Sequence, residues 1–361
     1  MNSSSYRSFL ALVSSLSGNP PEKLEWDEII ALANQSLTIT SLAAVLTNFP
    51  NMQVPDDVQG YLSTVLARNT ERNCKLTAQL SELAGCLNRN GIEPVVMKGA
   101  AFLTGQQPTA PGARLLTDLD IFVRPEDMSK AIAALLNIGY QIRIHAGQGS
   151  WPGNPKFHLP VVLDRPGDAG SIDLQCRPRG PASFGDIEWL YRNSRRSTLE
   201  GRHLHVPTAF AQIVFLLLHD VFQDGDYWRG LFDLRHLLDI AHLARTEEID
   251  WHLLRSLFAA GYERNAVDTQ ILTAHALFRI DGASEFYFGR IACLQFARRR
   301  FQFGRHHLAK VLTLFTLLTE IVHFPSWDRF GGEPYPSRKQ EAHRKLRELR
   351  RIFRPVPVGK L

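Results

Sequence analysis

The spacing of apolar residues along the chain changes twice and divides it into three parts. From Tyr6 to about Asn90, apolar residues recur every three or four positions, which is the period of an amphipathic helix. From Ile92 to about Val206 the pattern alternates between apolar and polar residues, as in half-buried strands. From Pro207 onward the helical period returns. We therefore expect helices, a strand-rich part, and helices again.

The strand-rich part contains one clear helix among several short alternating segments. The segments read as strands are PVVM, TDLDIFV, GYQIRIHA, FHLPVVLD, GSIDLQCR and HLHV. Between two of them, PEDMSKAIAALLNIG has the spacing of an amphipathic helix that ends at Gly139. This mixture predicts an α+β fold with one strand-rich domain of about 115 residues, an ordinary domain size.

These patterns also predict the boundaries of the parts. We expect an N-terminal helical region over 1–90, an α/β core over 91–206 and a C-terminal helical bundle over 207–330. Residues 331–361 form a Pro/Gly-rich loop followed by a basic tail. We find no internal repeat.

Composition indicates a soluble globular protein in a reducing compartment. The chain has 361 residues, of which 44% are hydrophobic and 21% charged. Its four cysteines show no CxxC pairing or zinc-ligand spacing, which favours free thiols and a cytoplasmic location. The longest apolar runs are shorter than a membrane span and contain charged residues, so no membrane span and no signal peptide are expected.

The net charge of +5 is concentrated near the end of the chain. Between Ser337 and Arg354 there are eight Arg and Lys residues against Glu341 and Glu348. Such a tail could contact an acidic partner, nucleic acid or acidic lipid. A solvated basic helix is the simpler alternative.

Acidic residues are arranged on two of the predicted strands. In TDLDIFV, the strand period places Asp118 and Asp120 on one face. Two carboxylates this close repel each other, and sharing a divalent cation such as Mg²⁺ relieves the repulsion. In SIDLQCR, Asp173 and Gln175 share a face in the same way. Three carboxylates on neighbouring strands could hold metal ions that orient nucleotide phosphates. A solvated or capping pair is the alternative for Asp118 and Asp120 alone.

The first strand of this part supplies features that suit a phosphate. Lys98 and Gly99 follow PVVM at a turn into a helix, where backbone N–H groups can face an anion. Arg114 lies four residues before Asp118 and could bind a phosphate through two hydrogen bonds. The chain has no G-x-S-x-G segment and no Walker lysine motif, which excludes the common serine hydrolase and P-loop patterns.

In this order, the motifs resemble the uncharacterised bacterial nucleotidyltransferase family of the polymerase-beta-like nucleotidyltransferase superfamily. The family pattern, LKGaal, then R, then DiDilv and later vDLHw, is similar to MKGAA, Arg114, DLDIFV and IDL here. The segments WDEIIALA, VPDDV, NTERNCKLTAQL, LLDIAHLARTEEIDWHLL and FRPVPV also resemble family landmarks, so the similarity covers most of the chain.

The resemblance implies a mixed-sheet nucleotidyltransferase core flanked by helical regions. It implies that Asp118, Asp120 and Asp173 bind Mg²⁺, with Mn²⁺ as a substitute, and that Asp173 helps to activate the acceptor hydroxyl. Lys98, Gly99 and Arg114 would bind the nucleotide. The implied reaction transfers a nucleotidyl group from a nucleoside triphosphate to a hydroxyl of a small molecule, peptide or glycan precursor, and releases pyrophosphate.

One departure keeps a second hypothesis open. The family histidine after the third aspartate is Gln175 here, and its aromatic neighbour is Cys176. Gln175 can form hydrogen bonds but cannot act as a base. A non-catalytic nucleotide-binding scaffold or regulatory protein on the same fold is therefore the alternative to an enzyme.

Overall fold

The computed structural model describes residues 3–50, 52–105, 110–144, 161–177, 186–280, 282–283, 286–305, 308–320 and 356–361. These residues form two compact units. The sheet unit comprises residues 54–179 and 184–212, and the helical unit comprises the residues up to 53 and from 213 onward, with 180–183. The Pro/Gly-rich loop and the basic residues of the predicted tail, 337–354, lie outside the described residues.

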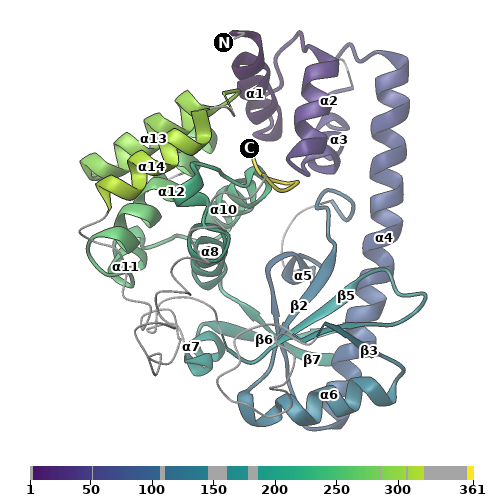
Figure 1. Cartoon of the computed structure of the whole chain (residues 1–361). Helices are drawn as coiled ribbons and strands as arrows, with labels where there is room; N and C mark the ends of the chain where they lie inside the picture. The colour runs from purple at the N-terminus through teal and green to yellow at the C-terminus, as the bar shows by residue number, and fades with distance from the viewer. Residues whose placement is uncertain are drawn as a thin grey trace. The chain divides into compact units, whose positions relative to one another are not determined.

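A seven-stranded mixed sheet forms the centre of the sheet unit (Figure 1). Its strands in spatial order are β3 (Gln141–Ile144), β4 (Val161–Asp164), β5 (Ser171–Gln175), β2 (Asp118–Phe122), β1 (Val95–Met97), β7 (Arg202–Pro207) and β6 (Ser194–Leu199). The pairs β2–β5 and β1–β7 are parallel, and the other neighbours are antiparallel. The predicted α+β fold with a mixed sheet is confirmed.

Four helices and a short 3₁₀ turn accompany these strands. They are α4 (Asp56–Arg89), α5 (Lys98–Phe102), η1 (Pro125–Asp127), α6 (Met128–Asn137) and α7 (Ile187–Arg192). The longest, α4, begins after Pro55 with two aspartates in its first turn, which favours a helix start. It ends before Gly91, whose φ of 72° is left-handed and stops the helix.

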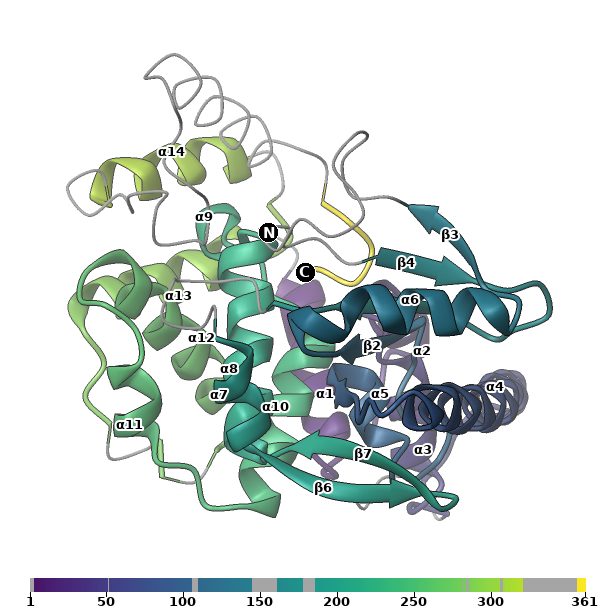
Figure 2. The same cartoon turned by 90° about the horizontal axis from the view of Figure 1, so that it is seen from below.

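The strand alternation of β2 and β5 directs their apolar residues to a core beneath α4 and α6 (Figure 2). Leu119, Ile121, Ile172 and Leu174 are fully buried in this core. The apolar face of α4 meets them through leucines spaced three and four residues apart, Leu76, Leu80, Leu83 and Leu87. The opposite face of β2 and β5 therefore carries Asp118, Asp120 and Asp173.

One strand was not expected from the sequence. The edge strand β6 contains Arg195 and Arg196, both exposed, and among the described strands it pairs with β7 alone. Exposed charges are common on edge strands because they discourage pairing with other chains. Such a strand lacks the apolar alternation by which strands are recognised.

The remaining helices lie in the helical unit, except that α8 (Ala209–Leu217) begins in the sheet unit and enters the helical unit at Ile213. They are α1 (Ser3–Leu16), α2 (Trp26–Gln35), α3 (Ile39–Leu46), α8 (Ala209–Leu217), a π-helical turn η3 (Leu218–Gln223), α9 (Asp226–Arg229), α10 (Leu234–Thr246), α11 (Trp251–Ser256), α12 (Tyr262–Phe278), α13 (Arg290–Gln302) and α14 (Ala309–Thr319). Within the described part of the chain, no helix is both long and apolar enough to cross a membrane.

Candidate functional site

The Lys-Gly turn lies directly after β1. Lys98 has a φ of 49°, in the left-handed region that residues other than glycine rarely adopt. Backbone strain of this kind is frequent at functional sites. A side chain at Gly99 would meet Leu116, because a Cβ atom there would lie 2.4 Å from Leu116 Cδ2. The turn therefore packs tightly against the segment that leads into β2.

The three predicted aspartates lie on two adjacent strands. Because β2 and β5 run parallel in register, Asp120 is directly opposite Asp173 and Asp118 is opposite Ser171. Adjacent strands are about 4.8 Å apart, so these side chains leave the same face of the sheet close together. Asp120 is buried, whereas Asp118 and Asp173 are half-buried. The structure thus brings all three aspartates to one place.

Asp120 accepts hydrogen bonds from two of the residues singled out in the sequence. Lys98 Nζ lies 2.9 Å from Asp120 Oδ1, and Gln175 Nε2 lies 3.3 Å from the same oxygen. The Lys98 side chain is only 22% exposed. Its ammonium group therefore provides the positive charge that balances this buried carboxylate.

The charges of this group shift two pKa values. Burial, followed by repulsion from Asp120 and Asp118, raises the pKa of Asp173 from 3.8 to about 7, although Lys98 acts in the opposite direction. Burial disfavours the charged form of Lys98, but the hydrogen bond to Asp120 and the attraction to Asp120, Asp118 and Asp173 together outweigh it and raise the pKa of that lysine. The group therefore carries more negative charge than Lys98 alone compensates, which suits the binding of an additional cation.

Arg114 is buried beside the Lys-Gly turn. Its guanidinium lies over the ring of Phe102, 5.5 Å from the centroid, and its Cζ is 4.0 Å from the position of a Cβ at Gly99. Nη1 donates a hydrogen bond of 2.8 Å to the carbonyl oxygen of Leu115. The structure therefore places Arg114 next to Gly99, which makes Lys98, Gly99 and Arg114 neighbours.

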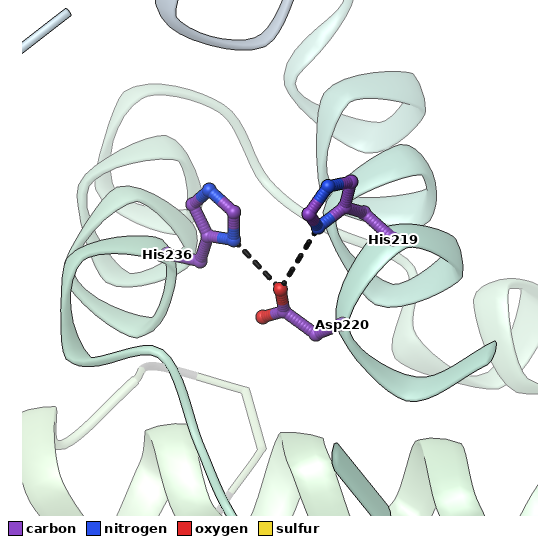
Figure 3. Close-up of side chains that lie close together, drawn as sticks. All are labelled: His219, Asp220 and His236. Atoms are coloured by element: carbon purple, nitrogen blue, oxygen red, sulfur yellow. Dashed lines mark hydrogen bonds and ion pairs between the residues drawn. The ribbon is translucent and has the colours of Figure 1, made fainter. Parts of the chain in front are cut away.

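A second cluster of titratable side chains lies in the helical unit. Among the described residues, two groups have ligand atoms that all lie within 4.8 Å of one another: His219, Asp220 and His236 (Figure 3), and Asp220, Asp224 and Asp226. The three strand aspartates do not form so close a group. In the helical unit, Nδ1 of His236 and Nδ1 of His219 lie 2.7 Å and 3.3 Å from the same oxygen of Asp220.

Lys360 occupies the middle of this second cluster. Its Nζ lies 2.7 Å from Asp226, 3.0 Å from Asp224 and 3.3 Å from Asp220. The residue is held there by hydrogen bonds in both directions between Leu361 and Phe232. A lysine of the same chain thus compensates part of the negative charge of the cluster. Nothing in the sequence pattern indicates this partnership, which joins residues more than a hundred positions apart.

Comparisons with known proteins identify the family. No protein of curated function matches the chain. A crystal structure of an antigenic nucleotidyltransferase-like protein from Paracoccidioides brasiliensis is similar at 13% identity and a TM-score of 0.35, covering 59% of this chain and 96% of that one. The family model described as uncharacterised nucleotidyltransferase matches residues 22–279, which is most of the chain. The chain therefore belongs to the uncharacterised nucleotidyltransferase family.

Proposed function

We propose that the chain is a metal-dependent nucleotidyltransferase with a core of the polymerase-beta-like type, from the bacterial branch of that superfamily. The observation that carries this proposal is the convergence of Lys98 and Gln175 on Asp120, directly opposite Asp173. The order of features along the chain also supports it: a strand, a Lys-Gly turn, a short helix, and then two neighbouring acidic strands. We assign the core to the predicted segment 91–206, between its two flanking helical regions.

The donor set of the site fits a divalent cation. Carboxylate oxygens are the ligands that Mg²⁺ prefers, and Mn²⁺ accepts them as well. Burial, together with repulsion from Asp120 and Asp118, raises the pKa of Asp173, and a cation beside these carboxylates would relieve that repulsion. Asp118, Asp120 and Asp173 would hold the ion. When bound, it would supply charge compensation for the triphosphate and for the pyrophosphate that leaves.

The residues of the chain have separate roles in the proposed reaction. The acceptor hydroxyl oxygen forms a bond to the α-phosphorus of a nucleoside triphosphate while the bond to the bridging oxygen breaks, and pyrophosphate leaves. Asp173 accepts the hydroxyl proton as the new bond forms. Lys98 and Arg114 bind phosphate oxygens, and Gly99 allows the backbone to approach them. The acceptor is a small molecule, peptide or glycan precursor.

Turnover of labelled nucleotides tests this proposal. The purified chain is incubated with each of the four α-labelled ribonucleoside triphosphates and Mg²⁺, and pyrophosphate release and label transfer are measured. The Asp118→Asn/Asp120→Asn variant should lose turnover, whereas Asp164→Asn, on β4 of the same sheet with a 41% exposed side chain, should retain it. Equal turnover by the wild type and the double variant would refute the assignment.

A second candidate is a nucleotide-binding scaffold without catalysis. The observation in its favour is that Gln175, which cannot act as a base, occupies the position next to Asp120. Calorimetry distinguishes the two functions. Tight triphosphate binding without any product, unchanged in Asp173→Asn, would favour the scaffold.

A further inference from the structure

The loop that leads into β2 is bound along its length to α4. Its backbone carbonyl groups accept hydrogen bonds from side chains of that helix at five positions between 111 and 117. The bonds are Asn73 Nδ2 to Pro111 (2.7 Å), Asn69 Nδ2 to Gly112 (2.7 Å), both amides to Arg114 (3.0 Å each), Arg72 Nε to Leu116 (3.0 Å) and Arg72 Nη2 to Thr117 (3.4 Å). The next residue is Asp118.

The same helix also binds the residue that precedes β5. Gln79 Nε2 donates to the carbonyl oxygen of Gly170 at 2.8 Å, and the Gly170 N–H points back to Gln79 Oε1 at 3.4 Å. Gly170 is followed by Ser171, the residue opposite Asp118 in the parallel register. One helix therefore binds the starts of both acidic strands.

Two buried asparagines show how specific this binding is. Asn69 and Asn73 are 4% and 3% exposed, and their Oδ1 atoms have no hydrogen-bond partner among the described residues. Each amide uses both of its N–H groups on the loop. In the flipped orientation a carbonyl oxygen would face the loop carbonyls and repel them, so the network fixes the observed orientation.

Close packing accompanies the hydrogen bonds. A Cβ atom at Gly112 would lie 2.1 Å from Thr70 Oγ1 and 2.9 Å from the carbonyl oxygen of Leu66, both on α4. A Cβ atom at Gly170 would lie 2.9 Å from Leu76 of the same helix. Both loops therefore lie with their backbones directly against α4. Neither loop can shift along the helix without losing its hydrogen bonds and its close packing there.

We propose that Asn69, Arg72, Asn73 and Gln79 are positioning residues that set the separation of the carboxylates on β2 and β5. Asn69 and Gln79 are ten residues apart, about 15 Å along a rigid helix, so the two loops have fixed places relative to each other. The inference rests on the proposed function, because it assigns these residues a role in holding the metal site. They act through the backbone and touch neither metal nor nucleotide.

Asn88 provides a matched control on the same helix. It donates to the carbonyl oxygens of Ile92 (3.0 Å) and His203 (2.9 Å) and accepts from the His203 N–H (2.8 Å). Its side chain thus makes three hydrogen bonds to the backbone, against two for Asn73, but none of its partners leads into β2 or β5. Asn88→Ala should lower thermal stability without altering the carboxylates.

The test compares Asn73→Ala, Gln79→Ala and Asn88→Ala in the full chain, well below their unfolding temperatures. Mn²⁺ affinity is measured by electron paramagnetic resonance, and amide hydrogen exchange is followed over 115–120 and 171–175. We expect Asn73→Ala and Gln79→Ala to weaken Mn²⁺ binding by about tenfold to a hundredfold and to speed exchange at the strand starts. Asn73→Asp places an oxygen against the loop carbonyls. It should therefore weaken Mn²⁺ binding at least as much as Asn73→Ala does.

The outcomes separate this inference from the proposed function. If Asn73→Ala and Asn88→Ala bind Mn²⁺ as the wild type does, the positioning role is wrong, and the metal site itself stands. If the wild type binds no Mn²⁺, the proposed function fails and the role in holding a metal fails with it. A changed KM or a weakened Mn²⁺ affinity for Asn73→Ala would support positioning, because a merely structural loss would lower the amount of active protein, and with it the apparent kcat, and leave KM and metal affinity unchanged.

Discussion

Replacing Asp173 with asparagine should change how the stability of the metal-free protein depends on pH. In the folded chain the pKa of Asp173 is raised to about 7, whereas in the unfolded chain it has its ordinary value of 3.8. Between these values the folded state keeps a proton that the unfolded state has released. The stability contributed by this proton is fully present below pH 3.8 and is lost as the pH rises through about 7.

The size of the effect follows from the shift. At about 1.36 kcal/mol for each pKa unit, the change from 3.8 to about 7 corresponds to about 4 kcal/mol, and partial solvent access to Asp173 reduces this to about 2–4 kcal/mol. Asparagine has nearly the shape of the protonated acid and does not titrate. Relative to the wild type, Asp173→Asn should therefore be similar in stability below pH 3.8, more stable by about 1 kcal/mol at pH 5, and more stable by about 2–4 kcal/mol at pH 8.

Urea unfolding of both proteins in EDTA from pH 5 to pH 8 measures this difference directly. All other groups titrate in both proteins, so the difference between the two curves isolates Asp173. Asp164→Asn on β4 should follow the wild-type curve. Excess Mg²⁺ at pH 8 should stabilise the wild type more than Asp173→Asn. Parallel wild-type and Asp173→Asn curves over this pH range would refute the electrostatic description of the site.

Three further substitutions have expected results. Gly99→Ala should lower the free energy of unfolding by about 1–3 kcal/mol in urea, because its Cβ would lie 2.4 Å from Leu116; Leu116→Val should recover part of the loss. Lys98→Met should cost about 3 kcal/mol in the absence of divalent ions, since Asp120 would stay buried without its partner, and Mg²⁺ should restore part of it. Lys360→Met should cost about 3–5 kcal/mol by thermal or urea unfolding, because several buried carboxylates lose their shared cation.

Each of these has a control on an exposed position. Gly60→Ala lies within α4 with open space around the added Cβ, so it should be neutral or slightly stabilising. Lys130→Met on α6 and Lys310→Met on α14 remove exposed lysines and should change stability by less than about 0.5 kcal/mol. Each substitution at Gly99, Lys98 or Lys360 should lower the free energy of unfolding more than its control does. An equal or smaller loss would contradict the packing or charge contact described for that residue.

The sequence predicted the parts of the fold that follow from local periodicity. The alternation in β2 and β5 indicated which residues enter the core, and Leu119, Ile121, Ile172 and Leu174 are fully buried there. Periodicity could not identify the edge strand β6, because its exposed residues carry no apolar pattern. It predicted helical structure up to about Asn90, but not that polar residues of α4 bind the loops before two strands.

The features that the sequence did not predict depend on contacts between residues far apart in the chain. The motif order placed Lys98, Asp118, Asp120 and Asp173 together as candidates, but not the salt bridge between Lys98 and Asp120. NTERN stood out in the sequence only as a family landmark, although its asparagines form hydrogen bonds across about forty residues. Lys360 likewise binds aspartates more than a hundred residues away. Such pairings depend on tertiary packing and leave no periodic pattern in the sequence.

The most direct test of the proposed site is a crystal structure of the full chain with Mn²⁺ and a non-hydrolysable nucleoside triphosphate analogue, with the metal located by anomalous scattering. We expect the metal between Asp118, Asp120 and Asp173, the triphosphate beside Gly99, and Lys98 Nζ moved from Asp120 to a phosphate oxygen. A metal bound only at His219, Asp220 and His236 in the helical unit, with the strand aspartates unoccupied, would contradict the account.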